Sequence, residues 1–411
     1  MSAPQPTSDY LLDRPGISDE ARALRAELVG RAREIVPVLA ANAATTEADR
    51  RVAEENITLI DDAGLFAIMK PKRFGGFETD FRTKLEVSRE LARGCGSTAW
   101  ATTLMNVCSW FGGLFPDQAQ RDVWESVPGN RIAGVLAPSA EAVKVDGGYR
   151  VTGRWGWASG CLHAQWAELG IPVPNEHGEI VDQGLVLIPM SDLSIEDTWF
   201  VAGMRGTGSN TLVAADVFVP DHRVISLPAA VGGDYGTEHT DEALYRTAFV
   251  PAAALVLAGP QLGLAQAALE LVLEKAPKRT ISYTFYETQT EAPTVQLAVA
   301  EAAMLVDSAH LHAYRAAADI DAAAAAGVYP DYHARARVRA DTGWAIQQAR
   351  EAIRVLVSAH GASAFAEASP LQRIWRDSEV ASRHAVINPS ISYEVYGRSL
   401  LGITDGVTAL V

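Results

Sequence analysis

Short apolar runs separated by turn residues fill the stretch 131–223, whereas on either side of it the apolar spacing changes to three and four residues. The runs have the length and the β-branched content of strands. Asp146-Gly147-Gly148 between two of them is hairpin chemistry, because glycine adopts a positive φ without steric cost. The sequence therefore predicts a compact β insert between two helical regions, with strands at 132–136, 142–145, 149–152, 164–169, 184–190 and 211–219.

The part before the insert divides into a polar, proline-containing stretch and a helical region. We expect residues 1–16 to form a loose N-terminal arm. Residues 17–130 carry apolar positions at helical spacing, with a helix start at Ser18. The helix that opens at Ser97 is apolar nearly all round, so we expect it to be buried. An N-terminal helical domain at 17–130 and a β domain at 131–230 follow from these patterns.

Four long helical stretches rich in alanine and leucine follow the β insert. Short connections join them, which is typical of an antiparallel four-helix bundle. The predicted fold is thus mainly α with a β insert, and the bundle forms a C-terminal domain at 231–411, with helices at 242–276, 292–326, 331–359 and 370–386.

Charge and composition exclude several classes of function. The chain of 411 residues has a formal net charge of -15, which argues against a nucleic-acid partner. Its three cysteines show no metal-ligand or disulfide spacing, so we expect no metal. The most apolar run, 248–258, is shorter than the ~20 residues that span a bilayer. We therefore expect no membrane anchor and no export signal, and a cytoplasmic protein.

The predicted domain order resembles the acyl-CoA dehydrogenase fold: an N-terminal helical domain, a small central β-barrel or sandwich, and a C-terminal four-helix bundle. Three motifs resemble its two-component (group D) branch of flavin-dependent aromatic monooxygenases. These are Leu-Gln-Arg-Ile-Trp-Arg-Asp at 371–377 followed by His384, Trp157-Ala-Ser-Gly160, and Gly206-Thr-Gly-Ser209 before a strand that leads to Arg223.

This resemblance implies the oxygenase component of a monooxygenase or hydroxylase. Such a protein uses reduced flavin and O2, through a C4a-hydroperoxide, to hydroxylate a phenolic, polycyclic or indolic substrate. A separate NAD(P)H:flavin reductase supplies the reduced flavin, in agreement with the absence of a GxGxxG dinucleotide fingerprint after a strand. The fold relation favours FAD over FMN, although no residue decides between them.

The resemblance places the flavin ring against the loop 155–160. Trp157, with Trp155, offers an aromatic wall, and the hydroxyl of Ser159 lies near flavin N5. Ala137, Pro138 and Ser139 resemble the family's backbone contact to the pyrimidine edge of the flavin. The alternative reading is that the tryptophans belong to the β-domain core and that Ser159 only forms a turn.

Residues at the far end of the bundle resemble those that meet the cofactor's tail. Arg279 follows the first bundle helix, where family members reach across a subunit boundary to the flavin phosphate. His360 and Gly361 match a turn near the same tail. The alternative for Arg279 is a basic residue that complements a helix dipole. The resemblance and the apolar faces of the long helices predict a homotetramer, a dimer of dimers.

The candidate substrate-binding residues are Trp100, Asn106 and Phe111 on the buried helix and Thr207 and Ser209 on a loop. Trp110 is a further candidate for the wall of the substrate cavity. Asn106 could instead be a core amide bonded to backbone, and the loop at 207–209 could be a plain turn.

His384 is the candidate catalytic acid or base, with Ser159 assisting at the flavin. The sequence places His384 on the last long helix, two turns after Asp377 and so on or near the same face. An imidazole with an ordinary pKa near 6.5 can take a phenolic or indolic proton. The alternative is a surface histidine that meets the helix dipole.

Two other functions fit the fold. An acyl-CoA dehydrogenase needs a carboxylate base in the loop after the last long helix, but residues 385–390 read Ala-Val-Ile-Asn-Pro-Ser, and Glu394 lacks the expected glycine turn. A non-catalytic helical scaffold is the further alternative, which the polar loops of the β insert disfavour.

Overall fold

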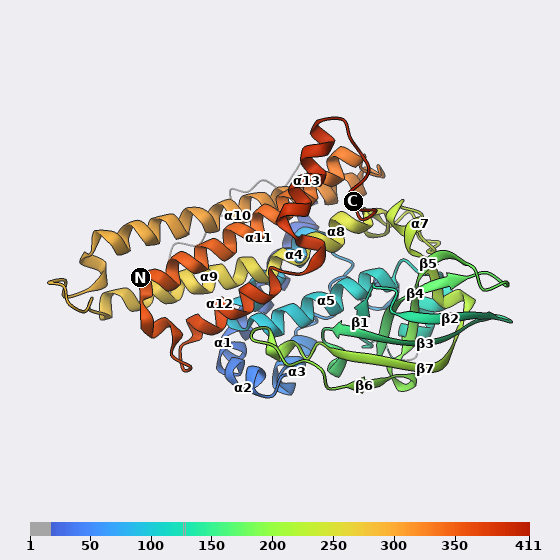
Figure 1. The fold of residues 1–411 in the computed structure, drawn as a ribbon, viewed down its shortest axis with the longest axis horizontal. Coiled ribbons are helices and arrows are strands. Elements are labelled where there is room, and N and C mark those ends of the chain that lie inside the picture. Colours follow the sequence, from blue (N-terminus) through green and yellow to red (C-terminus); the bar gives the residue numbers. More distant parts are fainter. Residues whose placement is uncertain (1–17, 126, 128) are drawn as a thin grey trace.

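The computed structural model describes residues 18–125, 127 and 129–411, so the predicted arm at 1–16 lies outside the described residues. A helical region, two small sheets and a second helical region follow one another along the chain, and the sheets lie at one end of the elongated molecule (Figure 1). The predicted fold class, mainly α with a β insert, is confirmed.

The N-terminal helices start where polar caps predict them. Ser18 accepts the N–H of Ala21 at 3.1 Å and begins α1, and Asp80 accepts the N–H of Thr83 at 2.7 Å and begins α4. Every residue of α5 except Leu104 is buried, as its apolar pattern predicts. The helices are α1 (Asp19–Ala41), α2 (Ala43–Ala48), α3 (Glu54–Asp62), α4 (Phe81–Gly94), α5 (Gly96–Gly112) and α6 (Asp117–Trp124).

The β region consists of two four-stranded sheets that pack face to face. One sheet has the order β1-β4-β5-β8, in which β1 and β4 are parallel, and the other has the antiparallel order β2-β3-β7-β6. A separate apolar core lies between them. The strands are β1 (Ile132–Val135), β2 (Ala140–Val145), β3 (Gly148–Ala158), β4 (Trp166–Pro174), β5 (Ile180–Pro189), β6 (Ser194–Glu196), β7 (Asn210–Pro220) and β8 (Val224–Ser226).

Strand β3 is longer than predicted, which changes the description of one candidate loop. Residues 155–158, predicted as a loop, form the last part of β3, and only Ser159 and Gly160 lie in the turn beyond it. The pairing of β3 with β7 shifts register between Trp155 and Ala158. The short edge strands β6 and β8 are additional to the predicted set.

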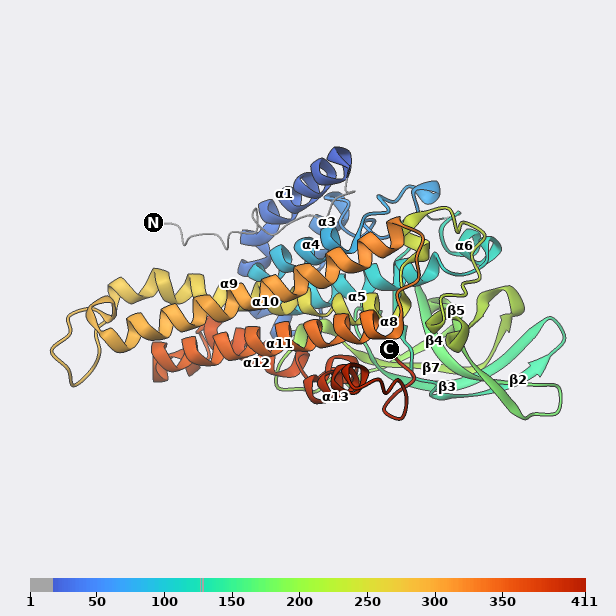
Figure 2. The ribbon, with the colours of Figure 1, turned by 90° about the horizontal axis from the view of Figure 1, so that it is seen from above.

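Long helices of the second helical region lie side by side and extend away from the sheets (Figures 1 and 2). The predicted stretch 242–276 is divided, because Pro260 lacks an N–H and is tolerated only in the first turn of a helix. The helices are α7 (Leu227–Val231), α8 (Phe249–Leu255), α9 (Ala258–Lys275), α10 (Pro293–Ala325), α11 (Tyr332–His360), α12 (Pro370–Ala381) and α13 (Pro389–Leu400).

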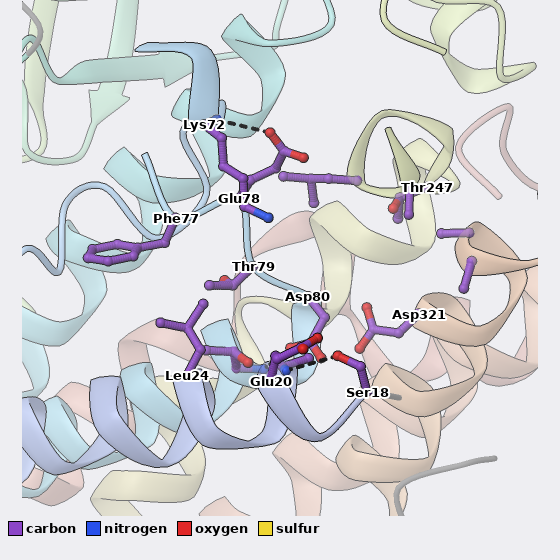
Figure 3. A pocket seen from close by; sticks show the side chains of 16 residues that line it. Ser18, Glu20, Leu24, Lys72, Phe77, Glu78, Thr79, Asp80, Thr247 and Asp321 are labelled. Carbon is purple, nitrogen blue, oxygen red and sulfur yellow. Dashed lines mark hydrogen bonds between the residues drawn. The ribbon is translucent and has the colours of Figure 1, made fainter. Parts of the chain in front are cut away.

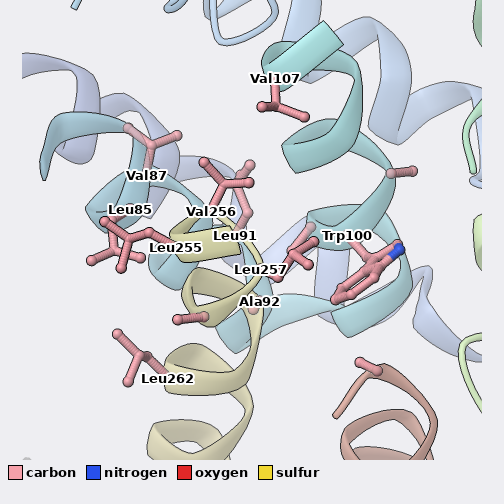
Figure 4. Packing of buried hydrophobic residues seen from close by; sticks show 14 of the residues in the cluster. Leu85, Val87, Leu91, Ala92, Trp100, Val107, Leu255, Val256, Leu257 and Leu262 are labelled. Carbon is pink, nitrogen blue, oxygen red and sulfur yellow. The ribbon is translucent and has the colours of Figure 1, made fainter. Parts of the chain in front are cut away.

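Apolar side chains of α4, α5, α8 and α9 join the two helical regions into one core (Figure 4). Leu85 and Leu91 of α4 and Leu255 and Leu262 of this core are almost inaccessible to solvent. The stretch Phe249–Lys278 is long and apolar enough to cross a membrane by length and composition, but 89% of the qualifying window is buried, as in the core helix of a globular domain.

Candidate active site

A chain of buried hydroxyl groups links Ser159 to the loop between β6 and β7. The Thr207 hydroxyl donates to the carbonyl oxygen of Met204 at 2.9 Å, and the contacts between Thr207 and Ser209 and between Ser209 and Ser159 are both 2.6 Å. Each hydroxyl has one proton. Because the Thr207 proton is used at Met204, Ser209 donates to Thr207 and Ser159 donates to Ser209. Ser159 therefore presents lone pairs, and not a proton, to any further group.

The Met204 peptide is the point where this chain meets the C-terminal helices. Its carbonyl also accepts the Trp199 indole N–H at 2.9 Å, and its N–H donates to the Asp377 carboxylate on α12 at 2.6 Å. Gly203 allows this approach, since a Cβ there would lie 2.2 Å from the carbonyl oxygen of Arg376. Asp377 was part of a predicted motif but not of the predicted site, because the sequence does not show what its side chain meets.

Burial raises the pKa of Asp377 to about 6. The Met204 N–H and the guanidinium groups of Arg376 and Arg373 oppose this rise in pKa, and Glu47 adds to it. The carboxylate is thus an acceptor at neutral pH, and it fixes the peptide on which the hydroxyl chain ends.

Trp157 presents an exposed aromatic face beside this chain. Its side chain is 70% exposed, and its ring meets Trp199 edge to face at 5.0 Å. The backbone of Trp157 has a φ of 70°, which a bulky side chain rarely adopts and which is most frequent at functional sites. Trp155, by contrast, is fully buried between the sheets and donates to the Gly170 carbonyl at 2.8 Å, so its prediction as part of the wall is wrong.

His384 does not lie on a long helix, so that prediction is wrong. Helix α12 ends at Ala381, and His384 follows with non-helical backbone angles, φ -58° and ψ 133°. The reason is the start of α13, where Pro389 occupies the first turn and Asn388 accepts the N–H of Ser390 at 3.0 Å. The chain therefore needs a connector at 382–388, and Asp377 and His384 do not share a helix face.

The connector nevertheless brings the imidazole to the buried helix. The rings of His384 and Trp100 are 6.1 Å apart between centroids. His384 is exposed to solvent, and partial loss of hydration of its ring lowers its pKa from 6.5. His384 is thus a neutral imidazole at neutral pH.

Helix α5 connects these groups. Ser97 contacts the Met204 sulfur at 3.9 Å, and the side chain of Met105 packs on Gly160, where an added Cβ would meet its sulfur at 3.2 Å. Trp100 lies between these two contacts in sequence. The Ser159 turn, the Met204 loop and His384 therefore border one stretch of α5, which we call the α5 site.

Other predicted substrate residues lie deeper in the helical core. Phe111 stacks on Phe249 at 4.6 Å, and Trp110 is fully buried with its N–H on the Leu244 carbonyl at 3.0 Å. The Asn106 amide donates to the carbonyl groups of Leu65 and Thr102, as in the core alternative. Its Oδ1 atom has no hydrogen-bond partner among the described residues. Their roles in substrate binding stay predictions.

Ala137, Pro138 and Ser139 form an exposed turn after β1. The Ser139 carbonyl accepts the N–H of Arg154 at 3.1 Å, which ties this turn to β3 a few residues before Trp157. The turn can thus present backbone groups near the exposed tryptophan.

Arg279, His360 and Gly361 border a cavity of about 720 Å³ at the end of the bundle remote from the sheets. Arg279 donates to the His360 carbonyl at 3.2 Å and to the Ser363 hydroxyl at 2.6 Å. Burial lowers the pKa of His360, and Arg279 and Lys275 lower it further. Among the described residues, Arg279 Nε and His360 Nδ1 are buried without a hydrogen-bond partner. The guanidinium group of Arg279 thus borders a cavity that could accept an anion.

A second cavity, of about 410 Å³, lies between α1, α4 and α10 and is acidic (Figure 3). Asp80 and Asp321 face it, and Asp321 accepts the N–H groups of Phe81 at 2.8 Å and Arg82 at 3.0 Å. These carboxylates cap α4 and would repel a phosphate, so this cavity does not suit an anionic cofactor. Within the described part of the chain, no group of three or more His, Cys, Asp or Glu side chains could hold a metal ion.

Comparisons with known proteins agree with this architecture. The family model for the acyl-CoA dehydrogenase N-terminal domain matches residues 18–125, and the model for the acyl-CoA dehydrogenase C-terminal domain matches residues 255–389. The solved structure of XiaF from Streptomyces sp., in complex with FADH2 and glycerol, superposes with a TM-score of 0.90 at 39% identity and covers 95% of this chain and 99% of that one. The protein is thus an acyl-CoA dehydrogenase-like flavoprotein by fold.

Curated relatives show to which group of these flavoproteins the chain belongs. The oxygenase subunit HsaA of a flavin-dependent monooxygenase from Mycobacterium tuberculosis is 36% identical over 91% of this chain and 95% of its own length. The oxygenase component of an FADH(2)-dependent resorcinol hydroxylase from Rhizobium sp. is 33% identical over 92% and 94%. The chain belongs to the family of oxygenase components of flavin-dependent monooxygenases, which confirms the resemblance predicted from its motifs.

Proposed function

We propose that this protein binds reduced FAD from a separate reductase and hydroxylates an aromatic substrate at the α5 site. The observation that carries the proposal is the direction of the hydroxyl chain, which leaves Ser159 as an acceptor. Reduced flavin carries a proton on N5 and is a donor there, whereas oxidised flavin N5 is an acceptor. Ser159 is therefore matched to the reduced cofactor, with Trp157 as the surface on which its ring stacks.

Each residue of the site has a part in this proposal. The bound flavin supplies activation of O2 and transfer of one oxygen atom to the substrate. Trp100 and His384 border the position of the substrate ring, and His384 Nδ1 or Nε2 takes the proton that leaves the substrate. A flavin on Trp157 and a substrate beside Trp100 would displace water from the α5 site, which limits loss of activated oxygen as peroxide. The names of the relatives support an aromatic substrate, since they include hydroxylases of resorcinol and p-hydroxyphenylacetate.

The cofactor's phosphates would bind at the Arg279 cavity of a neighbouring subunit. The Gln261 side chain on α9 donates to the Ser378 carbonyl at 3.0 Å, so this part of α9 lies beside Asp377. From Gln261, α9 runs about 20 Å further toward Arg279, which separates Arg279 from the α5 site of its own chain. Leu297, Met304 and Leu311 recur at seven-residue spacing on α10, and they are 71%, 69% and 48% exposed. These features support a homotetramer in which another copy covers α10 and supplies Arg279.

The proposal is tested by oxygen uptake with and without a source of reduced flavin. The purified protein with NADH alone should consume no oxygen above background, because no dinucleotide-binding motif is present. Addition of chemically reduced FAD, or of a flavin reductase, should start oxygen uptake and the formation of a hydroxylated product. Steady NADH oxidation by the protein alone would contradict the proposal, as would oxygen uptake driven by an acyl-CoA.

The direction of the hydroxyl chain gives a separate prediction. Ser159→Ala should reduce the preference for reduced over oxidised FAD by about fivefold, because one hydrogen bond contributes about 1 kcal/mol. Thr207→Val should have a similar effect although it keeps Ser159, since the chain can then reverse. Dissociation constants for both redox states, measured anaerobically by fluorescence, check this. A Thr207→Val protein with unchanged preference would refute the assigned direction.

A further inference from the structure

Three ionisable side chains that the proposed function does not use lie buried together next to the α5 site. Lys84 of α4 and Glu168 of β4 have no solvent exposure, and Cys108 of α5 is 4% exposed. Lys84 lies one turn before Ser88, whose hydroxyl contacts that of Thr103 on α5 at 2.7 Å. Glu168 pairs with Gly134, beside which the Cys108 sulfur packs. The Lys84 ammonium and both carboxyl oxygens of Glu168 have no hydrogen-bond partner among the described residues.

The position of Glu168 in its sheet is unusual for an acid. It pairs with Gly134 of β1 and Leu187 of β5, and on the same face it is flanked by Trp166 and Gly170. Trp166, Leu187 and Ile132 belong to the core shared with the helices, so this face packs on α5 and not on the interior between the two sheets. An apolar residue would be expected here, and the sequence has a carboxylic acid.

Two contacts place this cluster at the α5 site. A Cβ on Gly134 would lie 2.6 Å from the Cys108 sulfur and 3.8 Å from Glu168 Cβ, so α5 lies directly against this part of the sheet. Cys108 comes one helical turn after Met105, which packs on Gly160 beside Ser159. Along α5, Trp100, Leu104 and Cys108 follow at four-residue spacing and face the same side.

Burial also sets the ionisation of these groups. It lowers the pKa of Lys84 to about 7 and raises the pKa values of Glu168 and Cys108 well above their ordinary values. Burial thus favours the uncharged acid form of Glu168, whose carboxyl group can both donate and accept. A buried polar group without a partner destabilises the folded protein, and replacement by an apolar residue would remove this cost. Two such groups beside one site indicate a partner that is not part of the protein.

We propose that Glu168 and Lys84, on either side of Cys108, form a polar subsite that recognises a free hydroxyl group on the aromatic substrate. This inference rests on the proposed function for the position of the substrate ring. It adds the residues that bind this hydroxyl group, which would be held by hydrogen bonds at the end of the α5 site opposite to His384. The subsite discriminates against rings of equal size without the hydroxyl, because their binding would leave Glu168 unpaired.

The test compares two probes of similar size, 2-naphthol and 2-methylnaphthalene. Their dissociation constants are measured by anaerobic titration of the protein loaded with reduced FAD, so that no turnover occurs. The unsubstituted protein should prefer 2-naphthol by about tenfold or more. Glu168→Leu and Lys84→Met should each reduce this preference at least about fivefold, and Glu168→Gln should retain part of it because an amide still forms hydrogen bonds.

Tyr314→Phe is the matched control. Tyr314 on α10 is also fully buried, and its hydroxyl also lacks a hydrogen-bond partner among the described residues, but it packs on His310 and Arg82. Its substitution should leave the preference unchanged. If the Glu168→Leu protein does not fold, the preference for 2-naphthol is measured with Glu168→Gln and Lys84→Met alone.

Two results would overturn the proposal. One is an unchanged preference in Glu168→Gln and Lys84→Met together with higher thermal stability, because this is the behaviour of buried groups without a ligand. The other is an unsubstituted protein that binds the two probes equally. Neither result affects the proposed function, which depends on oxygen uptake with reduced flavin, and a failure of that oxygen uptake would leave the binding preference measurable.

Discussion

His384→Ala should lower the rate of hydroxylation by about 10²-fold or more while the protein still binds reduced flavin and consumes oxygen. The reason is the position of the imidazole, which faces Trp100 at 6.1 Å and is kept neutral by loss of hydration. Without a proton acceptor for the substrate, activated oxygen should leave as peroxide. Product and peroxide measured together in rapid-mixing experiments check the expectation.

The pH dependence of hydroxylation is a second test of His384 as the proton acceptor. Because desolvation lowers the pKa of His384 below 6.5, the neutral base persists as the pH falls through that value. Hydroxylation should therefore decline only at a pH below the ordinary value for histidine, and His384→Ala should abolish this acid limb. His222→Ala is a suitable control, since His222 is bonded to Asp122 at 2.7 Å on α6. Near-normal product formation by His384→Ala would show that His384 is only a surface histidine.

Arg279→Ala should weaken flavin binding by about 1.5 to 3 kcal/mol, or roughly ten- to a hundredfold in Kd, because a charge-assisted hydrogen bond to phosphate is lost. Arg279 borders the cavity of about 720 Å³, and its buried Nε has no hydrogen-bond partner within the described part of the chain. Lys278→Ala is the matched control, since Lys278 is the adjacent cation and pairs with Glu274 at 3.5 Å on the helix surface. Titration with reduced FAD should show the loss only for Arg279→Ala.

Mixed oligomers show whether Arg279 serves a neighbour. Co-expressed Arg279→Ala and His384→Ala chains should recover activity at limiting flavin, because some sites then combine an intact Arg279 from one chain with an intact His384 from the other. If both residues served the same chain's flavin, no mixed site would be intact. A sedimentation measurement that shows a monomer with tightly bound flavin would exclude this arrangement altogether.

The fold could be predicted because apolar spacing changes at clear positions along the chain. The buried helix α5 and most of the strands follow directly from that spacing. The end of α12 could not be predicted in the same way, because apolar and helix-forming residues continue past Ala381. Only the Asn388-Pro389 pair signals that another helix begins, and such a signal is short and local.

The site was harder to predict than the fold, because its geometry depends on contacts between distant segments. Trp155 and Trp157 should share a face of a regular strand, yet the positive φ at Trp157 separates them into a core residue and an exposed one. Asp377 is unremarkable on its helix until the Met204 N–H is seen beside it. Nothing in the sequence distinguishes Glu168 and Lys84 from other charged residues, and only the folded structure shows that both are buried.

The Met204 peptide has a consequence for protein engineering. Its carbonyl is held by Trp199 and Thr207 of the β region, and its N–H is held by Asp377 of α12. A chimera that takes its β region from one relative and its last helices from another would pair loops and carboxylates of different origin. Recombination between family members should therefore transfer residues 199–209 and 370–384 together, as one inherited block.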